Sequence, residues 1–177
     1  MRLIKRLLLT IALFIIVLAV GSFFLPQKQQ VERTVEISAP ANVIYPHLAN
    51  PQLFVKWSPW SSIDPNMKTE FTGAESGEGA GMSWQSAQPS VGTGSWLITK
   101  AVENESLDVN MDFAGQGTAT SFFTLKPSGS NTAVTWGFET NAGMNPVMRW
   151  MGLMMDKMVG SEYEKGLLKL KGIVEKQ

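Results

Sequence analysis

Residues 107–113 read Leu-Asp-Val-Asn-Met-Asp-Phe, the clearest alternation of apolar and polar side chains in the sequence. Side chains of a β-strand point alternately to its two faces, so the segment predicts a strand with one apolar and one polar face. Leu107, Val109, Met111 and Phe113 form the apolar face. An antiparallel sheet that packs one face on a core has this pattern.

Similar short runs surround this strand, separated by Gly, Pro, Asn and Ser. Such breaks are typical of antiparallel strands joined by turns. We therefore predict six further strands, at 31–37, 67–73, 81–86, 93–102, 118–126 and 133–140. Trp96, Phe123 and Trp136 fall on the apolar side of the pattern, which predicts a seven-stranded sheet with an apolar concave face.

Helices are predicted on both sides of this run of strands. Pro40 fits the first turn of a short helix, and a second short turn covers 51–57, with Trp57 and Trp60 in the loop after it. Residues 145–176 carry apolar side chains every three or four positions, which predicts one long amphipathic helix. This order of elements belongs to the α+β class.

The N-terminus carries an uncharged stretch from Leu7 to Leu25 behind three cations, Arg2, Lys5 and Arg6. As a helix it is about 28 Å long, close to the roughly 30 Å apolar thickness of a bilayer. We predict a membrane anchor at 1–26, a short polar linker at 27–30 and one folded domain at 31–177. A cleaved signal peptide is the alternative, but the apolar run continues past the small residues at 19–21 and favours retention.

The position of the cations predicts the topology. Cations beside a span tend to stay in the cytoplasm, so the N-terminus is expected inside and the domain outside the cytoplasm, which is the periplasm if the cell is a Gram-negative bacterium. Beyond the anchor, 12 basic residues face 15 acidic ones, and this balance excludes a nucleic-acid partner. The sequence has no Cys and a single His, His47, so we expect no disulfide, no zinc site and no cofactor.

Two motifs and the order of elements resemble a known family. They are Ser38-Ala39-Pro40 after the first strand, and Trp57-Ser58-Pro59-Trp60-Ser61 followed by Asp64-Pro65. Residues 31–175 resemble the polyketide cyclase/dehydrase branch of the SRPBCC (START/Bet v 1-like) superfamily. The resemblance implies a helix-grip fold, in which a curved antiparallel sheet wraps the C-terminal helix around a cavity for a lipid or another apolar small molecule. It transfers no catalytic residues.

The candidate ligand-binding residues are large apolar side chains on the predicted sheet face, the Trp-rich segment and the last helix. Aromatic rings and flexible thioethers suit an adaptable apolar cavity, although each could equally be ordinary core. The predicted set is Trp57, Trp60, Trp84, Trp96, Met111, Phe113, Phe123, Trp136, Met148, Met151 and Met155. The six Met residues between 144 and 158 also leave a Cu(I) site open, although no His or Cys supports it.

Three classes of function fit these observations. The leading hypothesis is a membrane-anchored, extracytoplasmic domain that binds a hydrophobic or amphipathic small molecule between the sheet and the C-terminal helix. An enzyme of the cyclase or dehydratase type would need an ionisable group in the cavity, such as His47 or the strand carboxylates Asp108, Asp112 and Glu139. A structural envelope domain with a collapsed core is the third class. No catalytic residue and no metal ligand is assigned.

Overall fold

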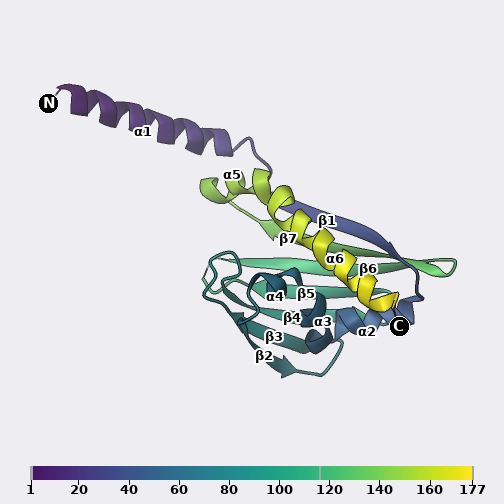
Figure 1. The fold of residues 1–177 in the computed structure, drawn as a ribbon. Coiled ribbons are helices and arrows are strands. Elements are labelled where there is room, and N and C mark those ends of the chain that lie inside the picture. The colour runs from purple at the N-terminus through teal and green to yellow at the C-terminus, as the bar shows by residue number, and fades with distance from the viewer. Residues whose placement is uncertain (1, 116, 177) are drawn as a thin grey trace.

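The computed structural model describes residues 2–115 and 117–176, and it has one helix projecting from a domain of sheet and helices (Figure 1). The helix is α1 (Arg2–Ser22). The strands are β1 (Lys28–Ile37), β2 (Lys68–Gly73), β3 (Ala80–Gln85), β4 (Thr93–Val102), β5 (Ser106–Asp112), β6 (Thr118–Ser128) and β7 (Asn131–Asn141). The other helices are α2 (Ala41–Ala49), α3 (Pro51–Trp57), α4 (Pro59–Ile63), α5 (Pro146–Met155) and α6 (Ser161–Val174).

The seven strands form one antiparallel sheet in the order β1-β7-β6-β5-β4-β3-β2. The predicted strands are therefore confirmed, with ends that shift by up to three residues. The helices α2, α3 and α4 and the C-terminal α6 pack on the same face of the sheet, and Figure 1 shows α6 lying across it. This is the helix-grip arrangement that the resemblance implied.

The sheet has two distinct ends because its strands are antiparallel. Lys28 pairs with Asn141, and Asp112 pairs with Thr118, so β1 and β6 begin where β5 and β7 stop. The loops 86–92 and 142–145 and the residues 113–115 after β5 share this end, which also receives the chain from α1; we call it the α1 end. The opposite end, where β1 stops at Ile37, is the far end.

Two sequence predictions about connections were wrong. The polar linker at 27–30 is mostly strand, because Lys28, Gln29 and Gln30 continue the pairing of β1 with β7.

The segment between the first two strands holds three short helices instead of two. Pro59 starts the third helix, α4, so Trp57 closes α3 and Trp60 lies in α4 rather than in a loop. Asn50 caps α3 with its side-chain oxygen, which accepts from the backbone amides of Gln52 and Leu53.

The pattern at 145–176 predicted one continuous helix, but the C-terminal helix is interrupted. A π-helical segment, Asp156–Gly160, separates α5 from α6. At this point Arg33 of β1 donates to the Asp156 carboxylate at 2.9 Å, and its guanidinium lies where a side chain at Gly160 would stand. The extra residue of a π turn lets the helix stay close to β1 while its direction adjusts, and such turns recur at functional sites.

The far half of the interior is filled by protein. Trp136 stacks on Tyr163 with ring centroids 3.8 Å apart and on Phe123 at 5.3 Å, and Trp57 meets Trp136 edge to face at 5.2 Å. Aliphatic side chains of the sheet, α2 and α6 pack around this cluster: Ile37, Ile44, Leu48, Leu107, Val134, Leu167 and Leu170. The core therefore stabilises one end of the domain and leaves the other end free for a cavity.

Candidate ligand-binding cavity

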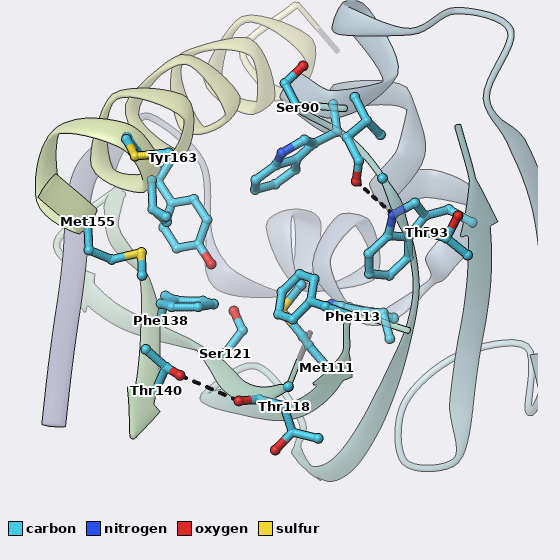
Figure 2. A pocket seen from close by; sticks show the side chains of 18 of the residues that line it. Ser90, Thr93, Met111, Phe113, Thr118, Ser121, Phe138, Thr140, Met155 and Tyr163 are labelled. Atoms are coloured by element: carbon cyan, nitrogen blue, oxygen red, sulfur yellow. Dashed lines mark hydrogen bonds between the residues drawn. The ribbon is translucent and has the colours of Figure 1, made fainter. Parts of the chain in front are cut away.

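A cavity of about 630 Å³ lies between the sheet and the C-terminal helix, in the α1 half of the domain. Figure 2 shows Met111, Phe113, Phe138, Met155 and Tyr163 around one common space. Their strands β5 and β7 form its floor and the helical segment 155–163 forms its roof. A cavity of this size lies within the range of about 300–1,000 Å³ that holds small molecules.

Eight of the eleven predicted binding residues line this cavity. They come from α4, from β3, β4, β5 and β7, from the turn after β5 and from α5, which are far apart in the sequence. They are Trp60, Trp84, Trp96, Met111, Phe113, Trp136, Met148 and Met155. The alternation of the strands thus correctly identified the face that points into the domain.

Trp57 and Phe123 do not line the cavity, because they belong to the filled far half. Phe123 pairs across the sheet with Leu107 and Trp136, one layer of inward side chains beyond the layer of Ser121 and Phe138 that borders the cavity. Trp57 is fully buried, and its indole N–H donates to the backbone carbonyl of His47 at 2.9 Å. Both are core residues.

Met151 does not line the cavity either. At about 100° per residue, Met155 lies nearly in line with Met148 along the helix, whereas Met151 is turned away from Met148 by about 60° and from Met155 by about 40°. It is exposed, together with Met144 and Met154, while Met148, Met155 and Met158 line the cavity. The six methionines are thus divided between two faces and do not form one cluster.

Several lining residues were not predicted. Phe138 and Ser121 share the inward side of β7 and β6 with Trp136 and Phe123, so the alternation contained the signal to find them. Phe54 follows from no pattern we used, because α3 is too short for a clear helical period. The loop residues at 89–92 also line the cavity, and only the folded chain brings them there.

The floor of the cavity carries a small polar group within apolar walls. Ser121 Oγ accepts from Trp136 Nε1 at 3.0 Å and donates to the carbonyl of Gly137 at 2.8 Å. Figure 2 shows the Tyr163 hydroxyl directed toward the same region. Burial raises the pKa of Tyr163, and hydrogen bonding with Ser121 and Trp136 opposes only part of this effect. The phenol therefore stays protonated at neutral pH and can donate to a ligand oxygen.

The cavity opens at the α1 end. Its buried lining residues, such as Met82, Trp96 and Phe138, lie inside the domain. Its exposed lining residues all come from that end: Pro89, Ser90, Thr93, Gly117, Thr118, Asn141, Asn145 and Met158. Most of this rim is polar, so the site offers an apolar interior and a hydrogen-bonding mouth, which suits an amphipathic molecule.

The titratable groups considered in the sequence lie elsewhere. Asp112 and Glu139 line a shallow groove on the outer face of the sheet, and Asp108 is exposed on that same face. His47 lies in α2 outside the cavity. Among the described residues that line the cavity, Tyr163 is the one titratable side chain. An acid–base reaction in this space would have to use that phenol.

His47 gives the domain a pH-dependent stability that can be measured. Partial burial, assisted by the charge of Lys56, lowers the pKa of His47. Folding therefore favours the neutral imidazole, so stability should fall as pH drops from about 7 through the usual His pKa of about 6.5. The loss should be complete below the folded pKa. Thermal unfolding of the full chain at pH 7 and pH 5 should reveal a lower midpoint at pH 5.

The control for this effect is His47→Gln. His47 is the single His of the chain, and the pKa values of Asp156 and Glu175 are lowered by hydrogen bonds with Arg33 and with Ser38, so both carboxylates stay ionised at pH 5. The variant should therefore lose most of the difference between the two midpoints. An equal difference in the variant would contradict the assignment to His47.

The antiparallel sheet, the long C-terminal helix and the apolar cavity between them define a helix-grip domain of the Bet v 1-like class. A family model described as polyketide cyclase/dehydrase and lipid transport matches residues 28–175, and the chain belongs to that family. The resemblance seen in the sequence is thereby confirmed. A comparison with curated proteins found no significant match.

Solved structures support the fold. A protein from Mesorhizobium loti is similar over 84% of this chain and 98% of its own, with 18% identity and a TM-score of 0.60. A protein of unknown function from Staphylococcus aureus is similar over 85% of this chain and 96% of its own, with 12% identity and a TM-score of 0.61. Ara h 8.0201 is similar over 85% of this chain and 99% of its own, with 10% identity and a TM-score of 0.54. At these identities the similarity supports the fold alone.

Proposed function

We propose that this protein is a single-span membrane protein whose outer domain binds a hydrophobic or amphipathic small molecule in the cavity. The observation that carries the proposal is an open space of about 630 Å³ with aromatic and thioether walls and a polar mouth. A ligand that buries about 300 Å² of apolar area would gain about 7 kcal/mol at about 25 cal/mol per Å². Ordering costs reduce this gain.

The membrane anchor is supported by α1. This helix has 21 residues, which corresponds to about 31 Å. Its side chains from Leu3 to Leu18 are exposed and do not pack against the domain. Lys5 and Arg6 lie at its start, so the cytoplasmic side is assigned to the N-terminus and the outer side to the domain. The last turn of α1 contacts α5, as expected for a helix that is retained instead of cleaved.

Two alternatives are less well supported. A ligand-free structural domain would have the interior filled to the α1 end, whereas in this domain Trp96, Met111 and Phe138, on the α1 side of the Phe123 layer, line an open cavity. A cyclase or dehydratase would need an acid–base group in addition to Tyr163 among the lining residues that the structure describes. Binding requires no such group.

A photoreactive fatty acid tests the proposal. The full chain in phosphatidylcholine vesicles would be irradiated with a diazirine-bearing fatty acid, and the modified peptides would be identified by mass spectrometry. We expect adducts on the inward residues of β4, β5 and β7, such as Trp96, Met111 and Phe138. They should decrease when unlabelled fatty acid is added in excess. Adducts confined to α1 and to the exposed side chains of α5, such as Met151 and Met154, would contradict binding in the cavity.

A further inference from the structure

The helix α5 and the residues on either side of it expose a row of apolar side chains. Met144, Val147, Met151, Met154 and Met158 recur every three or four residues, and each is between 47% and 67% exposed; we call them the α5 stripe. Trp150 and Leu153 are exposed beside it. A contiguous apolar surface of this kind marks a contact with a membrane or a partner. Apart from Met158, none of the stripe residues lines the cavity.

The α5 stripe is fastened to the end of the apolar helix α1. Trp150 Nε1 donates to the carbonyl of Leu18 at 3.0 Å. The buried guanidinium of Arg149 donates to the carbonyl of Ser22 at 3.1 Å and lies 5.5 Å from the ring centre of Phe23. These contacts fix the distance of α5 from α1, so the depth of one helix in a bilayer determines the depth of the other.

The charge distribution agrees with an apolar environment for this surface. From Met144 to Met155, Arg149 is the one charged residue, and it is buried against α1. Asp156 and Lys157 are the next charges along the chain. By contrast, the exposed side of α6 mixes Leu168 with Glu164, Lys165 and Lys169. A surface without charges, continuous with a helix of membrane length and bearing a tryptophan, fits the boundary between acyl chains and headgroups.

We propose that the α5 stripe lies in the outer surface of the same bilayer that α1 spans. This inference rests on the membrane anchor of the proposed function. It commits to a lipid bilayer as the partner because the stripe continues the exposed apolar surface of α1. Its consequence concerns the cavity: Met148 and Met155 line the cavity from the neighbouring face of the same helix, and Met158 belongs to both surfaces. The mouth then opens at the bilayer surface, where an apolar ligand can pass between lipid and cavity without crossing water.

The absence of cysteine from the sequence makes a direct test possible, since single cysteines can be labelled without background. Val147→Cys, Met151→Cys and Met154→Cys would report on the stripe. Leu13→Cys reports on the middle of α1, and the exposed Leu168→Cys on α6 is the matched apolar control. Each full-length variant would carry a nitroxide spin label in vesicles of phosphatidylcholine and phosphatidylglycerol. Collisions with oxygen, which prefers lipid, and with a polar nickel chelate, which prefers water, would then be measured.

The expected result is a graded series. Labels on the stripe should collide more with oxygen than with the chelate, at a shallower depth than the label at position 13, while the label at position 168 should favour the chelate. Water-like labels on the stripe together with a lipid-like label at position 13 would overturn the inference and leave the anchor intact. A water-like label at position 13 would overturn the anchor as well. Stripe labels protected from both reagents would mean a protein contact, and would also overturn the inference.

Discussion

Filling the cavity with Met111→Trp and Thr140→Trp is expected to weaken binding of the photoreactive fatty acid about tenfold or more. Both side chains line the cavity from the same layer of the sheet, on either side of Ala119. Two indoles there would remove space for the ligand, and a loss of about 60 Å² of buried apolar contact costs about 1.5 kcal/mol. The measurement is the cross-linking yield of the full chain as a function of probe concentration.

The matched control adds the same bulk on the other side of the same strand. Asn110 precedes Met111 in β5, and its side chain is exposed on the outer face of the sheet. Asn110→Trp should therefore bind the probe as the wild type does. Equal loss in this control, or full binding in the folded double variant, would show that the probe does not occupy the cavity.

Trp57→Ala should have the largest effect on stability. Its indole is fully buried, contacts Phe54 at 4.8 Å between ring centres and Trp136 at 5.2 Å, and donates to the carbonyl of His47. Removing a buried Trp from a packed core costs about 3–5 kcal/mol. Urea unfolding of the full chain, followed by circular dichroism, should give a free energy of unfolding lowered by about that amount.

Trp60→Ala separates this effect from the loss of any tryptophan. Trp60 is half-buried, borders the cavity and meets Trp136 and Tyr163 edge to face at its margin. The variant should lose much less stability than Trp57→Ala and should reduce retention of the ligand. If the two variants lost equal stability, the division between filled core and cavity wall would be wrong.

The strands could be predicted because their signal is local. The alternation in Thr93–Val102 and in 107–113 fixes both the strand and its inward face, and β4 has the predicted limits. The long C-terminal helix and its apolar period were visible for the same reason. Seven strands followed by a helix left few arrangements for burying the apolar faces.

The depth of a side chain along a strand could not be predicted. Phe123 and Ser121 both point inward from β6, and only the packing of α3 beneath the sheet decides that one is core and the other borders a cavity. The same limitation applies to Trp57 and Trp60, three residues apart. Met151 was placed on the cavity face because apolar residues spaced three or four apart can lie on more than one face of a helix. The exposed stripe on α5 was hidden in that same pattern.

Native mass spectrometry of the full chain, released from detergent micelles, can detect a ligand in the cavity without any assumption about its identity. We expect a population heavier than the bare chain by one small molecule, which organic extraction releases and which Asn110→Trp retains. In the Met111→Trp, Thr140→Trp variant this population should be reduced or absent. A wild-type chain that always has its bare mass, whether purified from cells or incubated with lipid extract, would contradict a ligand in the cavity.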